Sequence, residues 1–164
     1  MHKKKLNSPE DLSAKNPLIV PVYQTASFTF KNTEELAKFH KGEEKNKFLY
    51  SRFENPTAVA TESYLSTLEK SESSLLFSSG MAAITCSLIS LLGPGKKLIL
   101  PQTTYRHTSD LANKILSRYG VEIFTVSDFN ADTLEQISEK DIRVLFAEIP
   151  SNPLLSIPDI EKIA

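Results

Sequence analysis

Alternation between short apolar runs and helix-patterned segments is the strongest constraint in this sequence. Runs typical of strands fall at residues 74–77, 97–100, 121–126 and 142–147, and helical patterns lie between them at about 81–92, 108–119 and 132–138. Strands that alternate with helices at such short spacing form βα units, in which helices cover a parallel sheet. We therefore predict an α/β fold with a mostly parallel sheet. The pattern at 81–92 is apolar on most sides, so we expect this helix, with Cys86, to be buried.

The N-terminal region follows a different pattern. Residues 1 to about 16 are polar and show no apolar period. Leu18–Phe30 is apolar and β-favouring, but it contains Pro21 and has no helical stripe. These features favour an extended segment that lies over another surface.

Two asparagines stand where helix N-caps are expected. Asn32 predicts a short helix, and Asn55, followed by a proline, predicts a longer one. We expect an extended arm with a short helix over residues 1–54, and part of a larger domain over residues 55–164. A last helical pattern has made barely two turns at Ala164, so we expect this domain to continue beyond it.

Composition and charge exclude several classes of function. A formal net charge of -1 on 164 residues offers no electrostatic reason to bind nucleic acid or an anionic membrane. No run approaches the roughly 18 apolar residues of a membrane span. The single cysteine rules out an internal disulfide and a cysteine-rich zinc site, and His40 and His107 lack companions at metal-ligand spacing. We expect a cytoplasmic protein without a metal site.

Two segments have residues suited to binding phosphate. In Phe77–Met81, a small-residue turn before a helix would present backbone N–H groups and the positive end of the helix dipole, and Gly80 would permit close approach. An ordinary turn is the alternative. In Tyr50-Ser51-Arg52, the guanidinium could bind phosphate oxygens bidentately and the tyrosine could add a hydroxyl. The alternative is a surface arginine beside a half-buried tyrosine.

Two further segments follow predicted parallel strands at their carboxyl ends, where ligands bind in α/β folds. Tyr105 follows the strand at 97–100 and could stack on a flat ring. Asn152 follows the strand at 142–147, stands between prolines and could bond a ligand oxygen. The alternatives are a tyrosine that packs on its own loop and an asparagine bonded within its own turn.

The order of these segments resembles that of a known family. Leu18–Phe28, Tyr50–Thr57, Phe77–Ala83 and Glu148–Leu154 are similar to segments of the Cys/Met-metabolism PLP-dependent enzymes, which include cystathionine γ-synthase, cystathionine lyases, methionine γ-lyase and O-acylhomoserine sulfhydrylases. The resemblance runs from about Asn16 to the last residue. It implies the large domain of a fold-type I PLP-dependent transferase, of which this chain would hold the N-terminal portion.

The resemblance also implies a role for each candidate residue. The backbone N–H groups of Gly80 and Met81 would bind the phosphate of pyridoxal 5'-phosphate, with Ser79 in support. Tyr105 would stack on the pyridine ring and transfer protons near the leaving group. Asn152 would bond the phenolic oxygen of the ring.

Other implied roles cross a subunit boundary. Tyr50 and Arg52 would reach the phosphate bound to a neighbouring subunit, so the site would form only in a homodimer or homotetramer. Glu148 would be a supporting residue. The bulky Arg106-His107 pair departs from the small residues that usually follow Tyr105 in the family, which leaves the substrate open.

The implied chemistry is elimination or γ-replacement on cystathionine, O-acylhomoserine or a related amino acid, with the cofactor as electron sink. The family's Schiff-base lysine and pyridinium aspartate lie downstream of Asn152 and have no counterpart here, so we expect the chain alone to be inactive. Two alternatives remain: a non-catalytic remnant or complementing subunit that pairs with a full-length relative, and another phosphate-binding α/β module. The sequence contains neither the Gly-x-Gly-x-x-Gly nor the P-loop motif, which counts against the second alternative.

Overall fold

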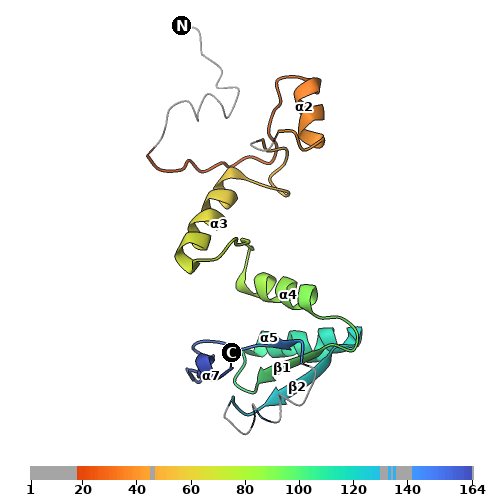
Figure 1. The fold of residues 1–164 in the computed structure, drawn as a ribbon, viewed down its shortest axis with the longest axis vertical. Helices are drawn as coiled ribbons and strands as arrows, with labels where there is room; N and C mark the ends of the chain where they lie inside the picture. Colours follow the sequence, from red (N-terminus) through yellow and green to blue (C-terminus); the bar gives the residue numbers. More distant parts are fainter. Residues whose placement is uncertain (1–17, 45–46, 130–132, 134, 136–141, 164) are drawn as a thin grey trace. The chain divides into compact units, whose positions relative to one another are not determined.

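The computed structural model describes residues 18–44, 47–129, 133, 135 and 142–163, and the chain divides into two compact units, Met1–Leu76 and Phe77–Ala164 (Figure 1). The predicted helix at 132–138 falls almost entirely outside the described residues. The predicted boundary between arm and larger domain at residue 54 stays a prediction.

The first unit contains the two helices that the asparagines predict. Helix α2 spans Thr33–His40 and helix α3 spans Pro56–Glu69. The Asn32 side chain accepts a hydrogen bond from the backbone N–H of Glu35 at 2.8 Å, and the Asn55 side chain accepts one from Thr57 at 2.8 Å. Both bonds satisfy N–H groups that have no partner inside the helix, so both predicted caps are confirmed.

The segment before α2 is extended, as predicted. Its contacts with the rest of its unit include an antiparallel bridge between Ser27 and Tyr50. An aromatic pair also connects the segment to its unit: the ring centroids of Phe28 and Phe48 lie 5.5 Å apart in a tilted arrangement. Tilted aromatic pairs add stabilisation beyond the area that they bury.

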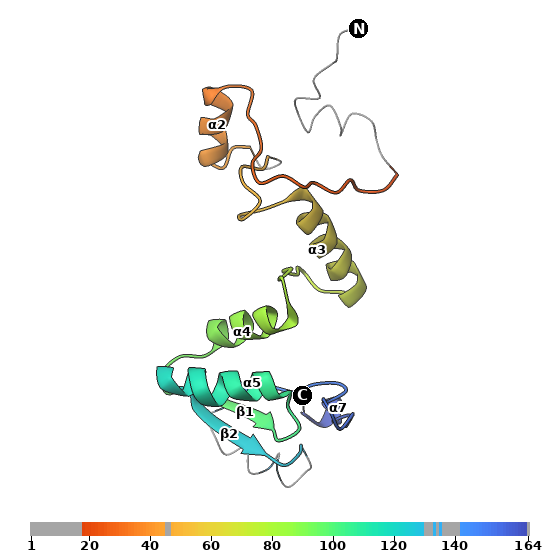
Figure 2. The same cartoon turned by 180° about the vertical axis from the view of Figure 1, so that it is seen from behind.

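The second unit is an α/β layer built on three parallel strands (Figure 2). Its elements in chain order are α4 (Gly80–Leu91), β1 (Lys97–Pro101), α5 (Arg106–Asp110), β2 (Glu122–Val126), β3 (Val144–Leu145) and α7 (Ile160–Ile163). The strand order is β2-β1-β3, and Leu98 pairs with both Ile123 and Val144. The predicted α/β fold with a parallel sheet is therefore confirmed.

The predicted helix before β2 is continuous but not uniform. After α5 the chain continues through a π-helical turn at Leu111–Ile115 and a 3-10 turn at Leu116–Tyr119. It stops at Gly120, as predicted, in a left-handed conformation with φ +79°. A Cβ added at Gly120 would lie 3.2 Å from the Cα of Pro94, so glycine suits this position for both conformation and space.

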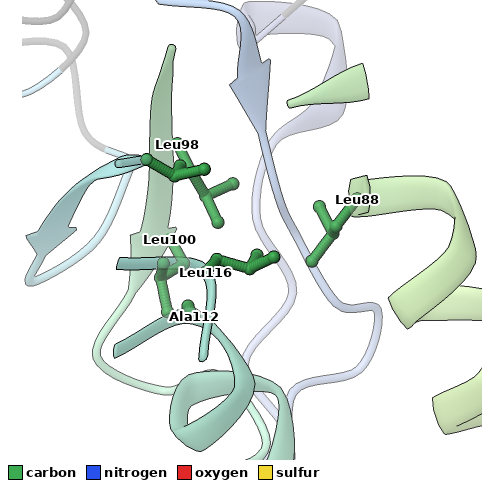
Figure 3. Close-up of a cluster of buried hydrophobic side chains, with 6 residues drawn as sticks. Leu88, Leu98, Leu100, Ala112 and Leu116 are labelled. Atoms are coloured by element: carbon green, nitrogen blue, oxygen red, sulfur yellow. The ribbon is translucent and has the colours of Figure 1, made fainter. Parts of the chain in front are cut away.

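The core lies between one face of β1 and the helical segments around it. Leu88, Leu98, Leu100, Ala112 and Leu116 are buried together in one cluster (Figure 3). Burying a leucine side chain contributes about 1.5–3 kcal/mol. This cluster therefore anchors β1, and with it the loop at its carboxyl end.

The predicted strand at 74–77 is wrong. Instead of pairing with another strand, this segment bonds to α3: the N–H of Leu76 donates to the Glu62 carboxylate at 2.8 Å, and the Ser74 hydroxyl donates to the Glu62 carbonyl at 2.6 Å. A strand is stabilised by a backbone ladder with a neighbour. Here one glutamate provides the acceptors, so no ladder forms.

The predicted burial of the helix at 81–92 is also wrong. Among the residues of α4 only Leu88 is buried, whereas Ile89 is 57% exposed and Cys86 is exposed rather than in the core. One side of α4 meets the core cluster through Leu88, and Leu91 is 47% exposed. In the described part of the chain, no helix combines the length and apolar character that a membrane crossing requires.

Candidate functional site

The first unit presents an arginine over an aromatic ring. The guanidinium carbon of Arg52 lies 4.9 Å from the ring centroid of Tyr50 and 5.6 Å from that of Phe53. A cation over an aromatic face is attracted to it, which restrains the exposed arginine. No carboxylate forms an ion pair with Arg52 among the described residues, so its N–H groups are available to an anion such as phosphate.

The same turn is bonded to the extended segment at residues 18–30, which is called the arm from here on. The N–H of Ser51 donates to the Ala26 carbonyl at 2.8 Å, the Asn55 amide donates to the Tyr23 carbonyl at 3.1 Å, and the N–H of Tyr23 donates to the Thr57 hydroxyl at 2.9 Å. These three hydrogen bonds hold the arm against the start of α3. Sequence reasoning recognised Asn55 only as a cap. The signal it missed was the set of polar residues around that cap.

The start of α4 offers unsatisfied backbone donors. Ser79 is the N-cap, and its hydroxyl accepts a hydrogen bond from the N–H of Ala82 at 3.1 Å. The N–H groups of Gly80 and Met81 lie in the first turn, where no carbonyl inside the helix can accept from them. A Cβ added at Gly80 would meet nothing within 4 Å. The predicted turn therefore presents backbone donors of the kind that bind anions at helix N-termini.

A sulfur contact joins this turn to the next helix. The Thr108 hydroxyl lies 3.7 Å from the sulfur of Met81, and Thr108 is buried. Tyr105 lies three residues before Thr108 and directly precedes the first residue of α5. The contact therefore connects the candidate phosphate-binding turn to helix α5, which directly follows the candidate stacking residue Tyr105.

Tyr105 is held at its backbone and at its ring. Its N–H donates to the Glu148 carboxylate at 2.9 Å. Its half-buried ring meets the ring of His107 edge to face, with centroids 5.1 Å apart and planes at 73°. Contact with His107 is consistent with the alternative that this tyrosine packs on its own loop. It also places His107, one of the two residues that differ from the family pattern, beside the candidate ring-stacking position.

Asn152 lies in a loop that two serines close. The N–H of Ser151 donates to the Ser156 carbonyl at 3.0 Å, the N–H of Ser156 donates to the Ser151 hydroxyl at 3.0 Å, and the two hydroxyl oxygens lie 2.6 Å apart. Asn152 is exposed, and its side chain bonds to nothing in the described chain. The alternative of an asparagine bonded within its own turn is therefore not what the structure shows.

A cavity of about 330 Å³ lies beyond the carboxyl ends of the strands. Its lining includes Pro101 at the end of β1 and Thr103 beyond it, Asp128 after β2, and Glu148, Ser151 and Asp159 after β3. Ligands bind at this end of parallel sheets. Of the predicted site residues only Glu148 lines it. Within the described ranges, no group of three or more histidine, cysteine, aspartate or glutamate residues could hold a metal ion.

Comparison with known sequences identifies relatives along almost the whole chain. The family model of the Cys/Met metabolism PLP-dependent enzymes matches residues 4–164. L-methionine gamma-lyase of Fusobacterium nucleatum subsp. nucleatum is 35% identical over 147 residues, and the match covers 90% of this chain and 37% of that protein. Chloroplastic cystathionine gamma-synthase 1 of Nicotiana tabacum is 34% identical over 148 residues, which cover 90% of this chain and 27% of that protein.

Solved structures give the same result. A putative O-acetylhomoserine (thiol)-lyase of Campylobacter jejuni, which carries N'-pyridoxyl-lysine-5'-monophosphate, superposes with a TM-score of 0.77 at 30% identity. That match covers 91% of this chain and 36% of the solved one. Cystathionine gamma synthase of Xanthomonas oryzae pv. oryzae, solved with cystathionine, has a TM-score of 0.75 at 26% identity over 87% of this chain and 35% of that one. The chain thus spans about a third of the length of these structures.

Proposed function

Because the chain belongs to the Cys/Met metabolism PLP-dependent enzyme family, we propose that it supplies cofactor-binding residues to an enzyme of sulfur amino-acid metabolism. The substrate would be cystathionine, an O-acylhomoserine or a related amino acid, and the reaction elimination or γ-replacement. Membership in this family replaces the alternative of an unrelated phosphate-binding module. A cytoplasmic location stays a prediction.

The observation that carries this proposal is the open N-terminus of α4. The N–H groups of Gly80 and Met81 have no acceptor in their helix, and nothing within 4 Å would meet a Cβ at Gly80. A phosphate fits there because it accepts several hydrogen bonds and is favoured by the helix dipole. Ser79 holds the turn through its cap. When bound, pyridoxal phosphate supplies an electron sink for the substrate carbanion.

Two residues of the same unit would orient the ring. Tyr105 is restrained by Glu148 and His107 and would stack on the pyridine face. Tyr105 would also exchange a proton with the substrate near its leaving group. The unbonded Asn152 amide would donate to the phenolic oxygen, from a loop that Ser151 and Ser156 close.

Tyr50 and Arg52 would complete the phosphate site of a neighbouring subunit. Support comes from Arg52, whose guanidinium is exposed and restrained over an aromatic ring, and which forms no ion pair in the described chain. The active assembly would then be a homodimer or homotetramer. The exposed apolar side chains of α4, such as Ile89, favour a second candidate role as a subunit that pairs with a full-length relative.

Competition between pyridoxal phosphate and phosphate-free pyridoxal tests the proposal. We expect the purified chain to prefer pyridoxal phosphate. In any assembled form we expect Arg52→Ala to weaken the retention of pyridoxal phosphate about tenfold or more, because a hydrogen bond to a charged group is lost. Arg118→Ala removes an exposed arginine elsewhere and is the matched control. Equal affinity for the two compounds would contradict the phosphate site. Unchanged retention in Arg52→Ala would contradict the role of Arg52.

Reduction with borohydride then tests covalent attachment. We expect scattered, trace labelling, since the family's Schiff-base lysine has no counterpart here. Near-stoichiometric labelling of one lysine would mean that another lysine substitutes for it, and turnover by the purified chain would then contradict the expectation that the chain alone is inactive. Co-expression with a full-length relative, followed by measurement of cystathionine turnover, distinguishes a complementing subunit from a catalytic assembly of this chain.

A further inference from the structure

The hydrogen bond between Glu148 and Tyr105 joins two segments that follow neighbouring strands. The residues are 43 positions apart, and the N–H of Tyr105 lies 2.9 Å from a carboxylate oxygen of Glu148. Tyr105 follows β1 and Glu148 follows β3, which pairs with β1 in parallel. The bond therefore ties the carboxyl ends of two adjacent strands.

Helix α5 needs a group of this kind. Tyr105 is its N-cap residue, and a tyrosine side chain makes no cap hydrogen bond there. In a capping box, a glutamate three residues into the helix accepts from the N–H of the N-cap residue. Glu148 accepts from that same N–H, but from a distant segment. Its negative charge also lies near the positive end of the helical segment.

Glu148 itself lies between two restrained points. On its N-terminal side, the N–H of Phe146 donates to the Ile99 carbonyl at 2.9 Å. On its C-terminal side is the loop that Ser151 and Ser156 close with hydroxyls 2.6 Å apart. Because the sheet and the closed loop restrain the backbone on both sides of Glu148, the hydrogen bond from Tyr105 to its carboxylate restrains the backbone of Tyr105 as well.

We propose that Glu148 is a positioning residue: its carboxylate sets the backbone of Tyr105, and thereby the direction of the tyrosine ring beside His107. Where this concerns pyridoxal phosphate, it rests on the proposed function. The placement of the ring itself does not, because the contact between Tyr105 and His107 involves only residues of this chain.

Nuclear magnetic resonance of the full chain tests this without a cofactor. In Glu148→Ala we expect the Tyr105 amide to exchange with solvent about tenfold faster, as the loss of one hydrogen bond implies. The His107 ring-proton shifts, which sense the Tyr105 ring, should move as well. Glu148→Gln keeps an oxygen acceptor and should restore both signals. Glu122→Ala removes an exposed glutamate of the same unit and should change neither.

The outcomes separate this inference from the proposed function. Unchanged Tyr105 exchange, or unchanged His107 shifts, in Glu148→Ala would overturn the positioning role. If Glu148→Ala fails to fold, Glu148→Asp retains the charge on a shorter side chain, and unchanged signals there would overturn it too. Failure of the wild-type chain to bind pyridoxal phosphate would contradict the proposed function and leave the resonance result to decide the role of Glu148.

Discussion

The side-chain amide of Asn55 donates a hydrogen bond to the backbone carbonyl of Tyr23, 32 residues earlier, at 3.1 Å. The other end of the same side chain accepts from the N–H of Thr57 at 2.8 Å. One residue therefore starts helix α3 and holds the extended arm, using its donor for one task and its acceptor for the other.

Asn55→Asp should separate these two tasks. The carboxylate still accepts from Thr57, so α3 should keep its cap, but it cannot donate to Tyr23. We expect the amide of Ser51, which bonds to the arm at Ala26, to exchange faster and the arm to be cleaved sooner by protease. Asn55→Ala loses both tasks and should also lower the free energy of unfolding by about 1 kcal/mol. An arm as protected in Asn55→Asp as in the wild type would contradict this prediction.

Much of the secondary structure could be predicted because its signals are local. Asn32 and Asn55 predicted where α2 and α3 begin, and Gly120 predicted where the helical segment before β2 ends. Failures arose where a distant group decides. The segment at 74–77 has β-favouring residues, yet Glu62 of α3 takes its hydrogen bonds. The composition of α4 is apolar on most sides, so it could not show which side of the helix packs against the core.

The candidate site follows the same division. Side-chain types made Arg52 and Tyr105 candidates, and only the order of the segments, which resembles that of a known family, assigned their roles, which stay predictions. The bond from Glu148 to Tyr105 spans 43 positions and depends on the register of β1 and β3. The closure between Ser151 and Ser156 depends on a turn geometry that residue types alone do not specify.

Substitution of Thr104 by valine should keep or raise the free energy of unfolding. Its hydroxyl oxygen is buried and has no hydrogen-bond partner in the described chain, which costs roughly 1–3 kcal/mol. Thr104→Val replaces the hydroxyl with a methyl group of similar size, so we expect the free energy of unfolding to stay equal or rise by about 1 kcal/mol. Urea denaturation measures this.

Thr108→Val is the matched control, because Thr108 is also buried but bonds to the sulfur of Met81. It should lower the free energy of unfolding. A loss of stability in Thr104→Val as large as that in Thr108→Val would show that the Thr104 hydroxyl has a partner.

Leu100→Ala tests the core cluster. Leu100 is 1% exposed and packs in the cluster formed by β1 and the surrounding helical segments. Removing its side chain should lower the free energy of unfolding by about 2–5 kcal/mol, through lost burial and a residual cavity. Leu154→Ala, at a side chain 70% exposed, should change it by less than about 0.5 kcal/mol. Equal effects in thermal denaturation would contradict the assigned core.

Acid should release the start of helix α2. A hydrogen bond from the N–H of Lys31 and the nearby ammonium of Lys47 hold the pKa of Glu35 below its usual value. Because the folded state has the lower pKa, the stabilisation is present above the pKa of the unfolded chain and is lost as the pH falls through the folded value. The carboxyl carbon shift of Glu35 should titrate below the usual glutamate range, and amide exchange in α2 should rise over the same interval.

Glu35→Gln should abolish that acid-dependent loss. Glu34→Gln, at a largely exposed neighbour in the same helical turn, should preserve it. A loss that persists in Glu35→Gln would assign it to another group.

Around residues 23–26 the arm is held through its main chain. The N–H and carbonyl of Tyr23, the carbonyl of Thr25 and the carbonyl of Ala26 meet Thr57, Asn55 and Ser51. Main-chain groups are the same in nearly every residue type, so these contacts are blind to the identity of the arm's side chains. Residues 23–26 are therefore free to drift in sequence, except that proline at Tyr23 would remove the N–H, whereas Phe28 also packs on Phe48 through its side chain. Evolution can alter what the arm presents outward, at exposed positions such as Val22, without loosening its attachment.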